Sequence, residues 1–282
     1  MKINYVAVIG GGTMGNGIVH VFAQNGYNVQ LLDQNEELLK NALTTITKNL
    51  DRQVKKEVIT EEVKTSTLSN IQILTNASKL NKSTNLVIEA IYENKDAKLE
   101  LFKMLNNSMP SEVIFASNTS AISITELGAA TRPDKFIGMH FMNPVPMMKL
   151  VEIIRGFATS DETYDLIKTT AESLGKVPVE VFDYPGFIAN RILMPMINEA
   201  IFALYEGVAS KESIDTVMKL GMNHPMGPLT LADFIGLDVC LAIMEVLLDG
   251  YNDAKYRPCP LLKKMVAANK LGRKTGEGFF KY

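Results

Sequence analysis

A glycine-rich turn between a short apolar run and an amphipathic segment constrains this chain more than any other feature. Residues 5–9 (YVAVI) are apolar, residues 10–15 (GGGTMG) follow at once, and apolar side chains then recur at helical spacing up to residue 23. A second apolar run at residues 29–32 ends on Asp33. The order strand, glycine turn, helix, strand and acid is that of a dinucleotide-binding unit.

Each part of this unit has a physical task. Gly10 permits a tight turn, Gly12 lets a pyrophosphate approach the backbone, and Gly15 lets the helix pack close to the sheet. The N–H groups at the start of the helix then face the phosphates. The carboxylate of Asp33 would bind the adenosine ribose and repel a 2′-phosphate, so we predict NAD rather than NADP. The residues predicted to hold the cofactor here are Gly10, Gly12, Thr13, Met14, Gly15 and Asp33.

Length and composition exclude several classes of protein. A chain of 282 residues has room for one large or two moderate domains, and 46% hydrophobic residues supply a core. A formal net charge of −2 offers no basic surface for nucleic acid. Cys240 and Cys259 lack the spacing of metal ligands or of a disulfide framework, so we predict no metal site and a reducing compartment.

The sequence also lacks targeting and membrane signals. Its N-terminus runs directly into the first predicted strand, which leaves no room for a signal peptide. No apolar run approaches the ~20 residues of a membrane span. We therefore expect a cytoplasmic protein that makes no membrane contact.

Strand and helix signals alternate along residues 1–182. Near-continuous apolar runs are typical of buried parallel strands, and amphipathic segments separate them. This alternation predicts an α/β fold, a Rossmann-like, doubly wound and mostly parallel sheet. The predicted strands are residues 5–9, 29–32, 71–74, 86–90, 113–116, 136–139, 150–154 and 177–182.

The character of the chain changes at residues 184–187 (YPGF), after which strand signals vanish. We therefore predict two domains, an NAD-binding domain at residues 1–184 and an all-α domain at residues 185–282. The second is rich in apolar residues for a small helical unit, which favours a homodimer interface on it. Simple packing on the first domain is the alternative. The helices predicted there are residues 188–205, 211–220, 229–248 and 260–270.

Residues 36–69 are predicted to form a helical hairpin that projects from the first domain. Apolar side chains recur at helical spacing, the opposite face is basic, and Thr60 can cap the second helix. Such a basic face is most often merely solvated. The functional alternative is contact with a phosphorylated substrate tail, for which Lys56 is the candidate.

Polar residues follow two predicted strands at the edge where ligands bind in such sheets. Glu93, Lys95 and Lys98 come after the strand at residues 86–90. Residues 117–120 (SNTS) leave the strand before them. They are either a plain loop with a helix cap or a set of hydroxyls presented to a ligand.

The sequence holds three histidines, so each can be weighed. His20 falls within the first predicted helix and His224 within a Pro/Gly-rich loop, so structural roles are favoured for both. His140 stands at the carboxyl end of a predicted strand, on the ligand side of the sheet. A carboxylate from Glu152 could fix its tautomer and stabilise the protonated ring for general base work. A solvent-facing Glu152 is the alternative.

Five sequence blocks, in order along the chain, resemble the 3-hydroxyacyl-CoA dehydrogenase family. The most specific is the run from His140 to Glu152 (HFMNPVPMMKLVE). The resemblance therefore extends well beyond a nucleotide-binding fold, and it is strongest to the bacterial short form that acts on 3-hydroxybutyryl-CoA. The other four blocks are residues 116–120 (ASNTS), 185–191 (PGFIANR), 224–228 (HPMGP) and 272–279 (GRKTGEGF).

The resemblance implies a role for each matching residue. His140 matches the catalytic base and Glu152 its paired acid, while Ser120 and Asn190 match residues that orient the substrate. Glu93, Lys98, Ser120, Asn143 and Lys274 match further cofactor contacts. Lys56 matches a lysine that meets coenzyme A, and Asn49 occupies a substrate-binding position that is often serine in the family.

The activity implied is NAD-dependent interconversion of (S)-3-hydroxybutyryl-CoA and acetoacetyl-CoA, with an acyl-CoA as the partner molecule. A longer or dicarboxylic 3-hydroxyacyl-CoA substrate is the first alternative. The second alternative is a non-enzymatic, crystallin-like relative that keeps the NAD site. Such a protein could tolerate loss of His140, Glu152 or Ser120, so the presence of all three argues against it. Dehydrogenases of free 3-hydroxyacids use a catalytic lysine instead of a His/Glu pair, so the His140/Glu152 pair argues against that class.

Overall fold

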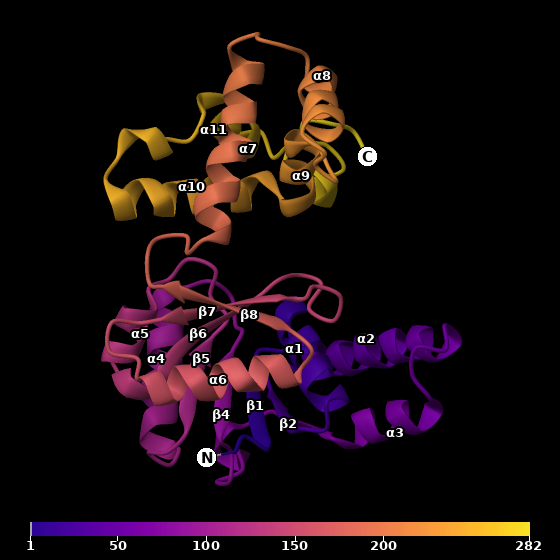
Figure 1. The fold of residues 1–282 in the computed structure, drawn as a ribbon, viewed down its shortest axis with the longest axis vertical. Helices are drawn as coiled ribbons and strands as arrows, with labels where there is room; N and C mark the ends of the chain where they lie inside the picture. The colour runs from indigo at the N-terminus through magenta and orange to yellow at the C-terminus, as the bar shows by residue number, and fades with distance from the viewer. Residues whose placement is uncertain (1) are drawn as a thin grey trace. The chain divides into compact units, whose positions relative to one another are not determined.

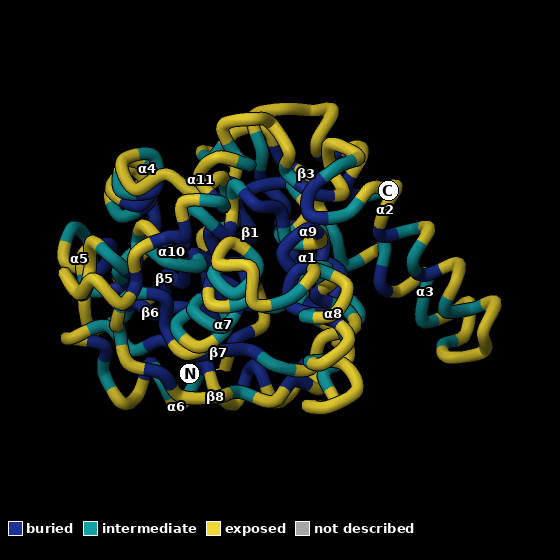
Figure 2. Tube along the Cα trace, turned by 90° about the horizontal axis from the view of Figure 1, so that it is seen from above, coloured by how far each residue is buried: buried dark blue, intermediate teal, exposed yellow. Residues whose placement is uncertain are grey.

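The computed structural model describes residues 2–282. The chain divides into two compact units, the first ending at Asp183 and the second spanning Tyr184–Tyr282. Figure 1 traces the elements of each unit, and Figure 2 shows buried backbone in both. Each unit therefore has a hydrophobic core of its own.

The described residues of the first unit build one eight-stranded sheet, in the order β3-β2-β1-β4-β5-β6-β7-β8. Strands β1 to β6 are mutually parallel, β7 runs antiparallel to β6, and β8 is parallel to β7. The carboxyl ends of β1 to β6 therefore meet along one edge of the sheet. The strands are β1 Tyr5–Ile9, β2 Asn28–Leu32, β3 Ile71–Leu74, β4 Leu86–Glu89, β5 Ile114–Ser117, β6 Phe136–Phe141, β7 Leu150–Arg155 and β8 Val177–Phe182.

Polar residues at the helix starts explain where helices α2 to α6 of this unit begin. Asn35 accepts hydrogen bonds from Glu37 N and Leu38 N, and Thr60 accepts one from Val63 N. Helices α2 and α3 form a hairpin, as predicted, that projects beyond the sheet (Figure 1). The helices are α1 Thr13–Gln24, α2 Glu36–Lys55, α3 Glu61–Ser69, α4 Lys95–Ser108, α5 Ile124–Ala129 and α6 Asp161–Ser173.

Apolar side chains cover both faces of the sheet. On one face, Ile18 of α1 and Ile167 of α6 belong to the same core as strand residues such as Val8. On the other face, the ring of Phe102 of α4 lies 5.7 Å from that of Phe115 and 4.7 Å from that of Phe136. This two-sided burial explains the near-continuous apolar runs of the central strands. The predicted fold class is confirmed.

The second unit is helical. Its helices are α7 Ala189–Tyr205, α8 Lys211–Thr216, α9 Pro228–Ile235, α10 Leu237–Tyr251 and α11 Pro260–Ala267, with a π-helical turn at Val217–Gly221.

One predicted helix of this unit, at residues 229–248, is two helices in the structure. Gly236 separates α9 from α10 with φ 105°, a backbone conformation that L side chains rarely adopt. A Cβ atom on this residue would also lie 3.0 Å from Asp238 and 3.2 Å from the Lys274 ammonium. Apolar periodicity continues through the break, which is why the sequence pattern alone missed it.

Candidate active site

The glycine-rich turn sits where β1 gives way to α1. Gly10 has φ 111°, and a Cβ atom there would lie 2.5 Å from the carbonyl oxygen of Ala90. A Cβ atom on Gly15 would run into the carbonyl group of Gly10. Both positions therefore require glycine, because side chains would force strand and helix apart.

The geometry of this turn fits a bound dinucleotide. A Cβ atom on Gly12 would meet no atom within 4 Å, so this residue faces open space. Helix α1, described over its whole length, has no side-chain cap and no acidic residue in its first turn. Its positive N-terminal end is thus available to phosphate groups. Asp33 at the end of β2 is held in place, because its carboxylate accepts from Gly11 N at 2.7 Å and Asn35 N at 2.9 Å.

His140 and Glu152 come together on neighbouring strands. They are directly paired in the antiparallel register of β6 and β7, and His140 Nδ1 lies 2.7 Å from Glu152 Oε2. Their side chains are 9% and 3% exposed. A carboxylate on Nδ1 selects the ring tautomer and leaves chemistry to Nε2. The backbone N–H of Phe141 donates to Asn118 Oδ1 at 2.9 Å, which fixes the strand beside the histidine.

Residues 117–120, here called the Ser120 loop, are organised by Glu93. Its Oε1 accepts from Thr119 Oγ1 at 2.5 Å and from Ser120 N at 2.9 Å. The predicted cofactor residue Glu93 and the predicted catalytic residue Ser120 are therefore brought together at the carboxyl ends of β4 and β5.

Lys98, a further predicted cofactor residue, is buried between two carboxylates. Its side chain is 1% exposed, and its ammonium lies 2.5 Å from Glu89 Oε1 and 3.1 Å from Glu93 Oε2. Glu89 is not among the residues predicted from the sequence. Its place at the end of a buried strand, nine residues before Lys98, was the available signal.

The loop between β6 and β7 carries Asn143, which is exposed. Lys176 holds this loop, donating to the carbonyl oxygens of Val145 at 2.5 Å and Met148 at 2.8 Å. Burial lowers the pKa of the Lys176 ammonium. Sequence reasoning missed Lys176 because it lies far along the chain from the loop that it binds.

The predicted coenzyme A residues lie on α2 and directly after its last residue. Lys56 follows the helix directly and is exposed, while Asn49 is half-buried and its Oδ1 accepts from Arg52 at 3.5 Å. Positions 49, 52 and 56 share one helix face by their spacing. The structure adds Arg52, a cation of the predicted basic face, to the candidate coenzyme A residues.

Two predicted residues lie in the second unit. Asn190 is in the first turn of α7 and is 9% exposed. Lys274 lies in the short helical turn Arg273–Thr275, and its ammonium is 2.5 Å from the carboxylate of Asp238 on α10.

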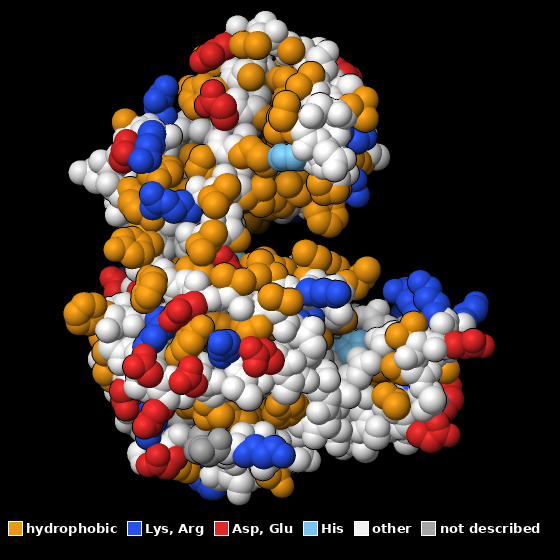
Figure 3. Space-filling model, viewed as in Figure 1, with side chains coloured by type: hydrophobic (Ala, Val, Ile, Leu, Met, Phe, Trp, Pro, Cys, Tyr) orange, Lys and Arg blue, Asp and Glu red, His pale blue; other side chains and the backbone are white. Residues whose placement is uncertain are grey.

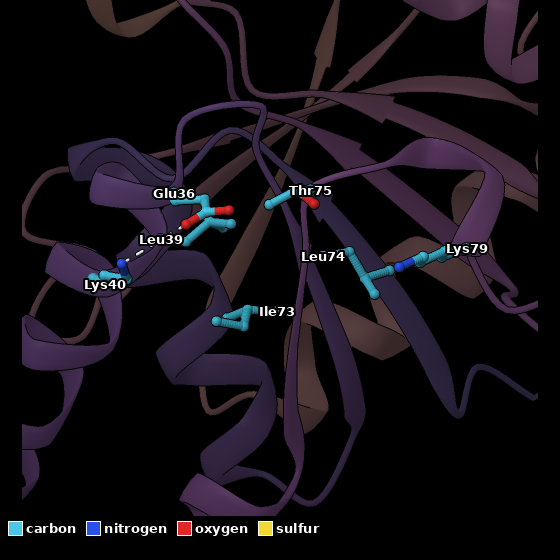
Figure 4. A pocket seen from close by; sticks show the side chains of 7 residues that line it. All are labelled: Glu36, Leu39, Lys40, Ile73, Leu74, Thr75 and Lys79. Atoms are coloured by element: carbon cyan, nitrogen blue, oxygen red, sulfur yellow. Dashed lines mark ion pairs between the residues drawn. The ribbon is translucent and has the colours of Figure 1, made fainter.

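A surface pocket between α2 and β3 shares no residue with the predicted sites (Figure 4). The 3.7 Å contact between Lys40 and Glu36 lies at its rim. Its lining mixes both charges with apolar side chains: Glu36, Leu39, Lys40, Ile73, Leu74, Thr75 and Lys79.

The described residues also bear on metal sites and membrane spans. Across residues 2–282, no group of three or more His, Cys, Asp or Glu side chains could hold a metal ion. None of the helices in this range has the length and apolar character to cross a membrane. Cys240 and Cys259 are buried free thiols, and burial raises the pKa of Cys240 to about 12.

Two family models together match almost the whole chain. The 3-hydroxyacyl-CoA dehydrogenase NAD binding domain matches residues 5–184, and the 3-hydroxyacyl-CoA dehydrogenase C-terminal domain matches residues 186–282. The chain belongs to the 3-hydroxyacyl-CoA dehydrogenase family. This 3-hydroxyacyl-CoA dehydrogenase is an NAD-dependent enzyme, and the predicted family and cofactor are confirmed.

Relatives and solved structures agree with this membership. The chain is 56% identical to the 3-hydroxybutyryl-CoA dehydrogenase of Bradyrhizobium diazoefficiens, over 99% of this chain and 96% of that one. It is also 56% identical to a probable 3-hydroxybutyryl-CoA dehydrogenase of Deinococcus radiodurans, over 98% and 99% of the two chains. The crystal structure of (S)-3-hydroxybutyryl-CoA dehydrogenase from Ralstonia eutropha matches with TM-score 0.97 and 51% identity, over 100% of this chain and 99% of that chain.

Proposed function

We propose that this enzyme interconverts (S)-3-hydroxybutyryl-CoA and acetoacetyl-CoA, with His140 and Glu152 as its acid–base pair. The observation that carries the proposal is the 2.7 Å contact between His140 Nδ1 and Glu152 Oε2 at the carboxyl end of β6. The names of the relatives support the substrate.

The proton steps belong to His140. In oxidation its Nε2 takes the proton of the 3-hydroxyl group, while Glu152 on Nδ1 compensates the positive charge that appears on the ring. In reduction the protonated ring returns that proton to the carbonyl oxygen. General acid–base assistance of this kind is worth roughly 10²–10⁴-fold in rate. Bound NAD supplies the hydride acceptor, and NADH the donor.

Positioning falls to further residues of the chain. Ser120 and Asn190 orient the substrate oxygen, and Ser120 is itself held through its backbone N–H by Glu93. The start of α1 with Gly10–Gly15 holds the pyrophosphate, and Asp33 holds the adenosine ribose. The further cofactor contacts that we propose are those of Glu93, Lys98, Ser120, Asn143 and Lys274.

Coenzyme A is held by the helical hairpin. Asn49 on α2 and Lys56, which directly follows α2, meet its phosphorylated end, and Arg52 adds a second cation to the same helix face. A cationic face of this kind suits a phosphate-bearing handle. Residues 1–184 serve as the NAD-binding domain, and residues 185–282 serve as the substrate and dimerisation domain.

A homodimer formed through the second unit completes the proposal. Hydrophobic side chains are exposed on this unit (Figure 3), among them Ile192, Leu220 and Met222 at 67%, 81% and 60% exposure. Exposed apolar patches mark interaction surfaces. Light scattering of the wild type and Leu220→Glu tests this part: we expect a dimer that the substitution weakens. A monomeric wild type contradicts it.

One assay tests the proposed reaction. Oxidation of NADH is followed by its absorbance with acetoacetyl-CoA, with NADPH in place of NADH as a cofactor control and free acetoacetate as a substrate control. We expect rapid turnover that requires both NADH and the thioester. Absent turnover with NADH still bound points to a different acyl-CoA, and a series of longer and dicarboxylic 3-oxoacyl-CoAs then identifies it.

A further inference from the structure

Glu89 is a buried acid at the end of β4 that the proposed mechanism does not use. Its residue is 0% exposed, and it lies against Lys98, which is 1% exposed. Building on the proposed function, we infer that Glu89 is a positioning residue for NAD: it holds Lys98, and through Lys98 it holds Glu93 and the Ser120 loop.

Three donors converge on the Glu89 carboxylate. Its Oε1 accepts from Lys98 Nζ at 2.5 Å and from Ile91 N at 2.7 Å, and its Oε2 accepts from Ser117 Oγ at 2.6 Å. An ionised carboxylate satisfies all three donors without a proton of its own. Burial raises the pKa of the Glu89 carboxyl, and the Lys98 ammonium opposes that change.

A buried ion pair of this kind needs a reason beyond stability. Removing two charges from water costs so much that well-packed apolar residues of similar volume often stabilise a protein as well or better. The buried pair of Glu89 and Lys98 contacts the predicted cofactor residue Glu93, whose carboxylate must be correctly oriented. Their position therefore favours a role in preorganising the site.

The chain of contacts leads from Glu89 to the surface. Lys98 also contacts Glu93 Oε2 at 3.1 Å, and the Glu93 side chain is 43% exposed. The other oxygen of Glu93 accepts from Thr119 Oγ1 and from Ser120 N. Both Glu93 oxygens are thus held, one by the buried ammonium and one by the Ser120 loop.

A second route joins Glu89 to the same loop. Ser117, whose hydroxyl donates to Glu89 Oε2, accepts from Thr119 N at 3.2 Å. Glu89 therefore restrains the loop at its first residue as well as through Lys98 and Glu93. The buried carboxylate of Glu89 thus restrains both Glu93 and the Ser120 loop.

The charges of the cluster make a specific prediction. Two carboxylates, Glu89 and Glu93, share the single ammonium of Lys98. If the charge of Glu89 is removed, Lys98 pairs with Glu93 alone and draws it away from Thr119 and Ser120. A nearly isosteric change at Glu89 should therefore disturb Glu93 without opening a cavity.

The test is Glu89→Gln, with the dissociation constant of NADH measured by its fluorescence in the absence of substrate. We expect roughly tenfold weaker binding, as for loss of a charged hydrogen bond, and a matching rise in the KM for NADH. Glu100→Gln is the matched control, because Glu100 is exposed on α4 near Lys98. It should leave NADH binding unchanged.

A rescue experiment separates positioning from general damage. Glu89→Asp keeps the negative charge that balances Lys98 but shortens the side chain. We expect NADH to bind Glu89→Asp more tightly than Glu89→Gln. A merely structural lesion predicts the opposite, since the shorter side chain leaves a cavity in the core that the glutamine does not leave.

Two outcomes overturn the inference: an NADH affinity of Glu89→Gln within twofold of the wild type, or a Glu89→Asp variant that binds NADH no more tightly than Glu89→Gln. Thermal unfolding of the cofactor-free protein checks that each variant folds. If Glu89→Gln does not fold, Ser117→Ala is tested in its place, and we expect a roughly threefold loss of NADH affinity. An unchanged NADH affinity of Ser117→Ala would then contradict the inference.

Glu93→Gln distinguishes this inference from the proposed function. If Glu93→Gln weakens NADH binding and Glu89→Gln does not, the inference is wrong and the cofactor site stands. If neither change affects NADH, the assignment of Glu93 to the cofactor site is wrong as well.

Discussion

His140 and Glu152 face each other across the antiparallel pair of β6 and β7, with Nδ1 2.7 Å from Oε2. This pairing depends on strand register, because a slip of one residue would turn one of the two side chains to the opposite face of the sheet. The next strand pair in the chain, β7 with β8, is parallel and braces Glu152 from the other side.

Replacing His140 with alanine should abolish turnover while leaving NADH bound. The ring supplies the proton transfer, so we expect kcat to fall roughly 10²–10⁴-fold. Steady-state kinetics and NADH fluorescence measure the two effects separately. If NADH binding is lost together with activity, His140 has a structural role instead.

Replacing Glu152 with glutamine should lower kcat and leave the KM for acetoacetyl-CoA nearly unchanged. The amide is neutral and can present an N–H to Nδ1, so it neither stabilises the protonated ring nor selects its tautomer. We expect a loss of about 10²-fold or more. Glu180→Gln, an exposed position on neighbouring β8, is the control. An unchanged kcat for Glu152→Gln contradicts the proposed pair.

Lys56→Ala should raise the KM for acetoacetyl-CoA roughly three- to tenfold, as for an exposed charge contact, and leave kcat unchanged. The effect should shrink in high salt. A thioester with the pantetheine arm but without the nucleotide should show no difference between wild type and variant. Lys55→Ala is the matched control, since Lys55 lies about 100° away around the helix axis. An equal rise in KM for Lys55→Ala would mean that the helix attracts coenzyme A only through its overall positive charge.

Asp33→Ser should reduce the preference for NADH over NADPH. The side chain of Asp33 is fixed by Gly11 N and Asn35 N, so its charge stands at a defined place near the glycine turn. Without that charge a 2′-phosphate is no longer repelled, and we expect the ratio of kcat/KM values to shift by roughly tenfold. An unaltered ratio removes Asp33 from the ribose site.

His20 should make stability fall as the pH drops. Burial lowers the pKa of its imidazole, with the ammonium of Lys176 acting in the same direction and a hydrogen bond with Gln24 opposing it. Below the ordinary histidine pKa of 6.5, the unfolded chain takes up a proton that the folded chain does not bind. The free energy of unfolding then falls by up to about 1.4 kcal/mol per pH unit, until the lowered folded pKa is reached.

The measurement is denaturant unfolding of the wild type and His20→Asn between neutral and mildly acidic pH. The carboxylates titrate alike in both proteins, so the difference between their free energies of unfolding isolates the contribution of His20. We expect the wild type to lose more stability than the variant on acidification. Parallel curves contradict this prediction.

Much of the site could be predicted because its signals are local. The turn at Gly10 and Gly15 follows from backbone sterics, and the helix starts at Asn35 and Thr60 follow from side chains that accept nearby N–H groups. The end of each apolar strand, as at Asp33 or His140, marks the ligand edge of the sheet. These features are contained in a few neighbouring residues.

The sequence by itself determined the alternation of strands and helices, the glycine turn and the identity of the candidate acid–base pair. Only the tertiary structure decided that Glu89 pairs with Lys98 and that Lys176 hydrogen-bonds to the loop that carries Asn143. It also decided that the helix breaks at Gly236 although the apolar pattern continues. Local sterics and periodicity act over a few residues, so a sequence displays them directly. Contacts between distant side chains depend on register and packing, which exist only once the sheet and its helices have assembled.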